Sequence, residues 1–255
     1  MPAPNSPVPS LRLDGHAVLV TGANKGLGRS IADTLHALGA RVYGTARNLD
    51  QAEQLARDFG TTPVVLNLSN PEASQEALRA LLEADPEIDL LVNNAGVNHP
   101  QPATEVELAK WDEMYATNVR GTFLVSQVFG RHWIDSSIAG VICTVSSQAG
   151  RVAIENRSGY SSTKAAVDQL TKNLAFEWGP HGIRVNAVAP TFVRTELTAS
   201  TLNNPEVAER LRARIPLGRF GEPHEVSSVV AFLLSDASSL VTGHTLLVDG
   251  GYTIH

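Results

Sequence analysis

An alternation of short apolar runs with longer helical patterns, unbroken from Ala17 to Val248, most constrains the fold of this chain. Several runs, such as Val18-Leu19-Val20 and Leu90-Leu91-Val92, are continuously apolar, which is typical of parallel strands covered on both faces. Seven strands are predicted, over Ala17–Thr21, Arg41–Thr45, Pro63–Leu66, Asp89–Val92, Val141–Val145, Arg184–Ala189 and Thr245–Val248.

Segments with helical periodicity lie between these strands, over Leu27–Leu38, Gln51–Phe59, Glu72–Glu83, Leu108–Ile134, Ser161–Trp178 and Glu222–Leu234. Strand, helix and strand in repetition require right-handed crossovers. We therefore expect one α/β domain over residues 11–255, with a doubly wound, seven-stranded parallel sheet and helices on both of its faces.

The composition excludes several classes of partner. The 255 residues include 20 Lys and Arg against 26 Asp and Glu, and this net charge of −6 argues against nucleic acid. No apolar run reaches the length of about 18 residues that a membrane span needs. A single cysteine, Cys143, rules out an intramolecular disulfide and indicates a reducing, cytoplasmic location. Residues 1–10, with four prolines, are expected to form a disordered tail.

Residues 195–220 depart from the alternation. They hold a short helical piece, Glu206–Arg214, between Pro205 and Pro216, and no predicted strand. Insertions in α/β sheets usually lie over the carboxyl ends of the strands, where ligands bind. We expect this segment to be a substrate lid, with a passive connection as the alternative.

The first strand runs into a glycine-rich turn, Gly22-Ala23-Asn24-Lys25-Gly26-Leu27-Gly28, at the start of a helix. Gly22 permits a sharp turn, Gly26 a close approach to a pyrophosphate, and Gly28 close packing of helix against strand. The helix N-terminus offers free N–H groups and a positive dipole end. The turn predicts a dinucleotide site, although its G-x-x-x-G-x-G spacing differs from the general G-x-G-x-x-G fingerprint.

The end of the second strand indicates which dinucleotide binds. NAD-binding sheets carry an acidic residue there, about 20 residues after the glycine turn, to hold the ribose 2′-hydroxyl. This chain has Ala46 at that position, followed by Arg47, and Lys25 lies within the turn. Two cations and no carboxylate favour a 2′-phosphate, so NADP(H) is expected. NAD(H) is the alternative, with Arg47 then a solvated surface charge.

Three polar residues have the spacing of an acid–base site. Tyr160 and Lys164 are four residues apart and share one face of a helix. A nearby ammonium favours the phenolate and lowers a tyrosine pKa whose reference value is about 10. Ser147 follows the strand Val141–Val145, at the sheet edge where ligands collect, and can hold a carbonyl oxygen while Tyr160 donates a proton.

Together these motifs resemble the short-chain dehydrogenase/reductase family from Leu13 to Tyr252. The resemblance rests on Thr21–Gly28, Asn93-Asn94-Ala95-Gly96, Asn118, Ser147, Tyr160, Lys164, Pro190 and Asp249-Gly250-Gly251. It implies a Rossmann fold and the catalytic tetrad Asn118, Ser147, Tyr160 and Lys164. In that tetrad Tyr160 is the acid/base and Ser147 orients the substrate. Lys164 binds the nicotinamide ribose and lowers the tyrosine pKa, while Asn118 positions a water of the proton relay.

The resemblance also implies how the cofactor is held. Asn93–Gly96 would support the central sheet and border the adenosine, while the main chain of Val193 and the hydroxyl of Thr195 would meet the nicotinamide carboxamide. The full implied cofactor site comprises Gly22, Asn24, Lys25, Gly26, Leu27, Gly28, Arg47, Asn67, Leu68, Asn94, Ala95, Gly96, Tyr160, Lys164, Pro190, Val193 and Thr195.

Three positions depart from the family pattern. Thr191 follows Pro190 where many members have glycine, so the pocket wall is bulkier and more polar. Asn67 replaces the usual aspartate beside the adenine but can still hydrogen-bond it. Ser146 precedes Ser147, and the thirteen-residue spacing to Tyr160 favours Ser147 as the catalytic serine.

Other polar residues are given structural interpretations. The eight histidines lack ligand spacing, so no metal is expected. Cys143 is expected to be a buried hydrophobe. Glu155 and Arg157, in the loop before Tyr160, are interpreted as solvated, with contact to a polar substrate as the alternative. The arginines at 210, 212 and 214 are interpreted in the same way, with an anionic substrate as the alternative.

The sequence as a whole predicts an NADP(H)-preferring oxidoreductase that interconverts a secondary alcohol and a ketone. The C-terminal half, including Ala175–Trp178 and Asp249–Thr253, is similar to gluconate 5-dehydrogenase and related enzymes, so a sugar acid, polyol or small carbonyl compound is the expected substrate. The alternatives are a 3-oxoacyl-carrier-protein reductase and a non-catalytic dinucleotide sensor. The resemblance also implies a homodimer or homotetramer, packed through the helix that ends at Trp178.

Overall fold

A computed structural model describes residues 9–254, so the tail expected over residues 1–10 lies almost entirely outside the described residues. Seven parallel strands form one sheet, in the order β3-β2-β1-β4-β5-β6-β7. The strands are β1 (Ala17–Val20), β2 (Arg41–Ala46), β3 (Val64–Val65), β4 (Leu90–Asn93), β5 (Val141–Val145), β6 (Arg184–Pro190) and β7 (Thr245–Val248). The predicted doubly wound, seven-stranded parallel sheet is confirmed.

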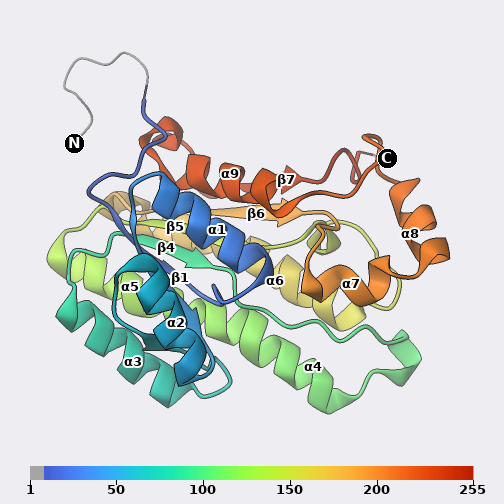
Figure 1. Ribbon diagram of the computed structural model, residues 1–255, viewed down its shortest axis with the longest axis horizontal. Coiled ribbons are helices and arrows are strands. Elements are labelled where there is room, and N and C mark those ends of the chain that lie inside the picture. The colour runs from blue at the N-terminus through green and yellow to red at the C-terminus, as the bar shows by residue number, and fades with distance from the viewer. Residues whose placement is uncertain (1–8, 255) are drawn as a thin grey trace.

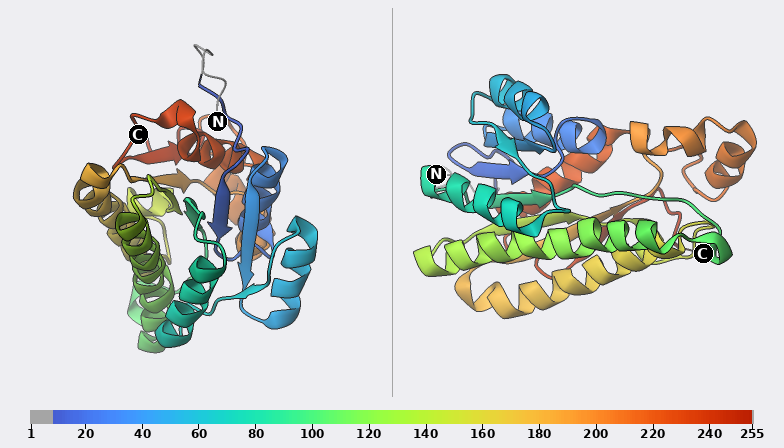
Figure 2. Two further views of the ribbon diagram at one scale, coloured as in Figure 1. Left: turned by 90° about the vertical axis from the view of Figure 1, so that its left-hand side faces the viewer. Right: turned by 90° about the horizontal axis from the view of Figure 1, so that it is seen from below.

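Helices cover both faces of the sheet (Figure 1). One face carries α1 (Gly26–Ala37), α2 (Leu49–Phe59) and α9 (Pro223–Leu234). The other carries α3 (Pro71–Ala84), α5 (Thr122–Ser136) and α6 (Ser158–Trp178), which lie together on one side in both views of Figure 2. Three shorter helices lie towards the carboxyl ends of the strands: α4 (Leu108–Tyr115), α7 (Glu196–Leu202) and α8 (Pro205–Arg212).

The continuously apolar strands explain this layering. In β1, Val18 and Val20 pack into the apolar cluster beneath α1, α2 and α9, while Ala17 and Leu19 pack into the cluster on the opposite face. All four residues are at most 1% exposed. A strand buried on both faces cannot alternate polar and apolar residues, which is the pattern that predicted a parallel sheet.

The strand order reverses between β1 and β4, and this switch point positions the ligand crevice. Thr21, directly after β1, ties the two strand ends together. Its hydroxyl oxygen accepts hydrogen bonds from the backbone N–H groups of Asn94 (2.9 Å) and Ala95 (3.0 Å). The Asn94 side-chain amide donates to the Thr21 carbonyl at 2.9 Å.

Two elements differ from the sequence prediction. The helix predicted over Leu108–Ile134 is broken by a π-helical turn, Ala116–Gly121, between α4 and α5. Such turns add only one residue per turn and are frequent at functional sites, so hydrophobic periodicity does not reveal them. The helix α7 was not predicted, because it is short and begins with a polar capping box between Thr195 and Thr198 rather than an apolar stripe.

The interior of β5 holds the one cysteine of the sequence. Cys143 is fully buried in β5, and burial raises the pKa of its thiol to about 12, so the prediction of a buried hydrophobe is confirmed. No helix among residues 9–254 is long and apolar enough to cross a membrane. The same residues hold no cluster of three or more side chains suited to a metal ion.

An ion pair at the amino ends of the strands makes stability dependent on pH. His16 Nδ1 lies 2.5 Å from Asp89 Oδ2, and this bond raises the pKa of His16. A raised imidazole pKa stabilises the fold below the unfolded value of about 6.5 and loses that contribution as pH rises through the folded value. The substitution His16→Gln should therefore lower the thermal midpoint more at about pH 5.5 than at about pH 9.

Thermal unfolding of wild type and variant at both pH values measures the effect. His181→Gln, at an exposed position, is the control. An equal loss at both pH values would show that the pair contributes no proton-linked stability.

Candidate active site

A cleft of about 1040 Å³ opens at the carboxyl ends of the first four strands, on both sides of the switch point. It brings together most of the residues expected to hold a dinucleotide: Gly22, Asn24, Lys25, Gly26, Leu27, Gly28, Arg47, Asn67, Leu68, Asn94, Ala95, Gly96 and Thr195. Pro190 and Val193 do not line this cleft; both are buried, at the end of β6 and just beyond it. We call this space the first cleft.

The glycine turn has the geometry of a phosphate cradle. Gly22 and Gly26 have φ angles of +66° and +55°, in the left-handed region that favours glycine. A Cβ on Gly28 would lie 2.2 Å from the Gly22 carbonyl oxygen, so only glycine fits there. No side chain caps the N-terminus of α1, which leaves its first-turn N–H groups available to an anion. The cradle fits a pyrophosphate.

A carboxylate that the sequence analysis had not placed here lies beside the turn. Glu196, the first residue of α7, lines the first cleft, and its Oε2 would be 3.0 Å from a Cβ on Gly26. The helix α7 therefore reaches across to the glycine turn from the far end of the sheet.

Two cations line the first cleft beyond the ends of β1 and β2. Lys25 and Arg47 are both exposed there. Other arginines of this half of the sheet, such as Arg29 and Arg41, pair with aspartates. Among residues 9–254, no carboxylate forms an ion pair with Lys25 or Arg47. The charges of both side chains are thus free to meet an anion.

A second cleft of about 510 Å³ adjoins the first, and Leu197 of α7 borders both. Ser147 and Tyr160 line this second cleft side by side with residues of the segment after β6. The remaining tetrad members are buried: Lys164 is 5% exposed and Asn118 is 1% exposed. The residues that the sequence singled out for acid–base chemistry therefore converge on one site.

Asn118 is held by the loop that follows β4. Its Oδ1 accepts a hydrogen bond from the Val97 N–H at 2.8 Å, and its Nδ2 donates to the Val97 carbonyl at 2.9 Å and to the Thr163 hydroxyl at 3.1 Å. The side chain is thus engaged at both ends. Asn118 therefore connects the loop after β4 with α6. It lies in the π-helical turn between α4 and α5.

Burial opposes charge on both titrating members of the tetrad. It raises the pKa of Tyr160 above the ordinary value for a phenol, against the lowering effects of a hydrogen bond with Ser147 and of the positive charge of Arg157. Burial lowers the pKa of Lys164 to about 8, against the raising effect of Asp168. Lys164 Nζ lies 5.5 Å from the centre of the Tyr160 ring and donates to the Val145 carbonyl at 2.8 Å.

Two expectations need correction here. Lys164 was expected to lower the pKa of Tyr160, but in this structure Ser147 and Arg157 are the groups that do so, because the ammonium is turned toward Val145. Arg157 was interpreted as solvated, yet it lines the second cleft and is only partly exposed. A loop residue just before a helix carries no periodicity that would reveal its direction.

Ser146 and Ser147 point in different directions, which supports the assignment of Ser147. The Ser146 hydroxyl donates to Asp168 Oδ1 at 2.7 Å, away from the second cleft. Asp168 also accepts hydrogen bonds from Arg151 Nε at 2.8 Å and from the Thr245 hydroxyl at 3.2 Å. This buried carboxylate anchors the end of β5 to α6 behind the tetrad.

Three buried oxygen atoms in the second cleft have no hydrogen-bond partner among the described residues. They are Asn98 Oδ1, Gln148 Oε1 and Thr191 Oγ1. Gln148 is only 2% exposed. Buried polar atoms are normally satisfied, so unpartnered ones in a cleft indicate a polar ligand. The sequence predicts a more polar wall at Thr191. No motif marks Asn98 or Gln148, so their place in the second cleft comes from the structure alone.

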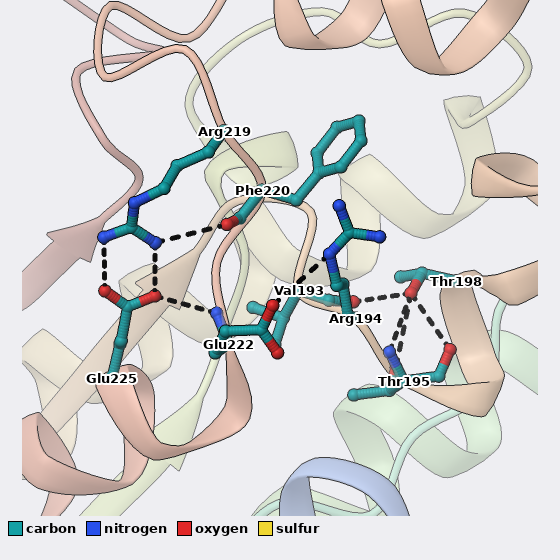
Figure 3. Close-up of polar contacts among 8 residues, drawn as sticks. All are labelled: Val193, Arg194, Thr195, Thr198, Arg219, Phe220, Glu222 and Glu225. Carbon is teal, nitrogen blue, oxygen red and sulfur yellow. Dashed lines mark hydrogen bonds and ion pairs between the residues drawn. The ribbon is translucent and has the colours of Figure 1, made fainter. Parts of the chain in front are cut away.

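The two ends of the expected lid are fastened together (Figure 3). Val193 and Gly221 form an isolated β-bridge, and the Arg194 N–H donates to the Gly221 carbonyl at 3.0 Å. Arg194 Nε lies 3.3 Å from Glu222 Oε1. The Thr198 hydroxyl donates to the Val193 carbonyl at 2.5 Å.

A second ion pair closes the C-terminal side of this fastening. Arg219 bonds both oxygens of Glu225, at 2.6 Å and 2.7 Å, and Glu225 also accepts the Glu222 N–H at 2.8 Å (Figure 3). These contacts lower the pKa of Glu225 to about 2. The Arg219–Glu225 pair therefore stays charged at neutral pH.

The lid arginines do not form an open basic surface. Arg210 pairs with Glu155 at 2.7 Å, Arg212 pairs with Glu209, and Arg214 lies over the Tyr252 ring. On the opposite side of the molecule, Phe176 of α6 is 87% exposed and so is not part of the core.

A short-chain dehydrogenase family model, described as enoyl-(acyl carrier protein) reductase, matches residues 22–253. The chain belongs to the short-chain dehydrogenase/reductase family. It is 46% identical to the L-xylulose reductase of Bos taurus over 243 residues, which cover 95% of this chain and 98% of that protein. It is therefore an oxidoreductase of this family.

Two further relatives share the fold and most of the length. The D-threitol dehydrogenase of Mycolicibacterium smegmatis is 38% identical, over 95% of each chain. A solved structure of a gluconate 5-dehydrogenase from Burkholderia cenocepacia, in complex with NADP and tartrate, is 34% identical with a TM-score of 0.92, over 96% of this chain and 98% of that one. The expected family and Rossmann-type fold are confirmed.

The buried Asp168 should control the protonation of Lys164. Because its negative charge raises the pKa of Lys164, the substitution Asp168→Asn should lower that pKa further below about 8. We expect the alkaline limb of the kcat/KM-versus-pH profile to move to lower pH. The profile of purified enzyme measures this, with Asp135→Asn on exposed α5 surface as the control. Coincident profiles for Asp168→Asn and wild type would leave Asp168 a purely structural role.

Proposed function

We propose that this enzyme interconverts a secondary alcohol and a ketone on a small polyhydroxylated substrate, with NADP(H) as the preferred cofactor. One observation carries the substrate class: Asn98, Gln148 and Thr191, each with a buried oxygen that lacks a partner among the described residues, line the cleft that holds Ser147 and Tyr160. Hydroxyl groups of a sugar, sugar acid or polyol are the donors that these acceptors lack. Similarity to an L-xylulose reductase and a D-threitol dehydrogenase supports the same class.

The tetrad supplies the proton chemistry. The Ser147 hydroxyl donates to the substrate carbonyl oxygen, and the Tyr160 hydroxyl transfers its proton to that oxygen as it becomes an alkoxide. A bound nicotinamide would supply the hydride for the carbonyl carbon in reduction and would accept it from the alcohol carbon in oxidation. The raised pKa of Tyr160 keeps the phenol protonated at neutral pH, which suits proton donation during reduction. Alcohol oxidation requires the phenolate and so is favoured at higher pH.

The residues that would hold the cofactor fit a phosphorylated dinucleotide. The uncapped N-terminus of α1 and the glycine turn would bind the pyrophosphate. Lys25 and Arg47 would meet the 2′-phosphate, since no carboxylate competes for their charges among residues 9–254. NAD(H) stays the alternative cofactor. Leu197 borders both clefts, which supports the assignment of residues 195–220 as a lid over the substrate and the nicotinamide.

Two alternatives have less support. A 3-oxoacyl-carrier-protein reductase would need an open basic surface at the entrance for its acidic carrier, and of the arginines at 210, 212 and 214 two are paired with the carboxylates of Glu155 and Glu209. A non-catalytic sensor would not need Ser147 and Tyr160 in one cleft. We also propose a homodimer or homotetramer packed through α6, since its Phe176 is 87% exposed.

Removal of the proton donor tests the mechanism. Tyr160→Phe should lower kcat by about 100- to 10,000-fold, the usual contribution of a general acid, while NADPH still binds. Initial rates with L-xylulose, xylitol and D-gluconate, together with fluorescence titration of NADPH, measure both effects. Tyr115→Phe, which removes a hydroxyl from a ring stacked on Trp111, is the control. A Tyr160→Phe enzyme with near wild-type kcat would overturn the assignment.

Removal of either cation tests the cofactor. Arg47→Gln and Lys25→Gln should each raise KM for NADPH by about 10- to 100-fold, because each loses a charge-assisted bond to the 2′-phosphate. KM for NADH should change less than about threefold. Arg57→Gln, on the outer surface of α2, is the control. Equal effects on both cofactors would contradict a 2′-phosphate site.

A further inference from the structure

The second cleft contains one cation, Arg157, whose charge the mechanism does not use. Arg157 is the residue directly before α6, three positions from Tyr160. Residues three apart on a helix have Cβ atoms about 5–6 Å apart, so the guanidinium is anchored one helical turn from the proton donor. The Coulombic influence of Arg157 on Tyr160 agrees with this proximity.

Arg157 has only neutral partners among the described residues. Its Nη2 donates to the Thr201 hydroxyl at 3.2 Å and its Nη1 to the Asn156 carbonyl at 3.3 Å. The nearby Glu155 is paired with Arg210 instead. Burial lowers the pKa of Arg157, which shows that the guanidinium has lost much of its water without gaining a carboxylate. A partly buried cation without a counterion has a strong preference for an anion.

The surroundings of Arg157 favour a ligand rather than an internal counterion. Arg157 lines both the second cleft and an outer cleft of about 1030 Å³ that reaches Arg214 and Tyr252. Gln148, 2% exposed and with an unpartnered Oε1, lines the same second cleft as Tyr160 and Arg157. The second cleft thus offers acceptors for substrate hydroxyl groups near Tyr160, and it offers one cation, Arg157, on the side that adjoins the outer cleft.

We propose that Arg157 binds the carboxylate of the substrate, so that this enzyme acts on polyhydroxy acids rather than on neutral sugars or polyols. This inference rests on the proposed function and specifies its substrate. Arg157 is the single cation that lines the second cleft among the described residues, which matches a single negative charge such as a carboxylate. In the outer cleft Arg210 is paired with Glu155, and Arg214 lies over the Tyr252 ring. The substrate would lie with its carboxylate toward the outer cleft. Its hydroxyl groups would donate to Gln148 and Asn98, and its reacting carbon would lie at Tyr160 and Ser147.

Matched substrate pairs test the proposal. Each pair has the same hydroxyl stereochemistry and differs in a carboxylate or a hydroxymethyl group at C1: D-gluconate with D-glucitol, D-xylonate with xylitol, and L-threonate with L-threitol. Oxidation rates with NADP⁺ and with NAD⁺ give kcat/KM for each compound. We expect the acid of the best pair to exceed its alditol by about 10- to 100-fold, the effect of one charge-assisted hydrogen bond.

Substitution of the cation then assigns the preference. Arg157→Gln should lower kcat/KM for the acid by about 10- to 100-fold, mainly through KM, and change the alditol by less than about threefold. Arg157→Lys should recover part of the loss, since it restores the charge without the planar fork. Arg57→Gln, which removes an arginine that is paired with Glu53 on α2 and lines neither cleft, is the matched control and should leave the ratio unchanged.

The outcomes separate this proposal from the one on which it rests. Turnover of alditols at least as fast as acids, or an equal loss of both in Arg157→Gln, overturns the carboxylate site and leaves the polyhydroxylated substrate class intact. No turnover of any pair with either cofactor overturns the proposed function. In that case the thermal shift caused by D-gluconate against D-glucitol, in the presence of NADP⁺, decides the site. A shift specific to the acid that Arg157→Gln abolishes supports the site, and its absence overturns it.

Discussion

The two clefts depend on the hydrogen bonds that Thr21 makes across the switch point of the sheet. By accepting the N–H groups of Asn94 and Ala95, its hydroxyl fixes the separation between the glycine turn and the loop after β4. That loop continues through Gly96, where a Cβ would lie 3.2 Å from Asn118 Oδ1. The Thr21 side chain thus helps to fix the distance between the glycine turn, which suits phosphates, and the tetrad, which suits proton transfer.

Burial has opposite effects on the pKa values of Tyr160 and Lys164 but the same effect on their charges. It raises the pKa of the phenol and lowers that of the ammonium, so both groups are driven toward their neutral forms. A site with little fixed charge of its own is sensitive to each neighbouring ion. Two neighbouring ions act against burial: Arg157 lowers the pKa of Tyr160, and Asp168 raises that of Lys164.

The sequence was informative where one residue type has one physical purpose. Continuous apolar triplets predicted strands that the structure buries on both faces. The glycines at 22, 26 and 28 predicted the turn after β1, and the structure leaves no space for a Cβ at Gly28. The spacing of Tyr160 and Lys164 placed both on α6. Family resemblance, rather than periodicity, selected Asn118.

The features that the sequence did not reveal are those set by tertiary contacts. The π turn contains Asn118, whose side chain forms hydrogen bonds with Val97 and Thr163, and both are remote from it in sequence. Nothing in the local pattern distinguishes Arg157, at the cleft, from Glu155, at the surface two residues earlier. The direction of a side chain in an irregular loop is decided by the elements that pack around it, and hydrophobic periodicity does not encode these.

The bridge between Val193 and Gly221 gives the intervening segment a modular character. Its two ends meet at one point on the scaffold, so a change in the length of the segment between them does not by itself require β6 and α9 to move apart. Doubling the length of such a closed loop costs only about 0.6 kcal/mol of closure entropy. The residues that this segment contributes to the second cleft can therefore change together, while Ser147 and Tyr160, which lie on other elements, keep their places.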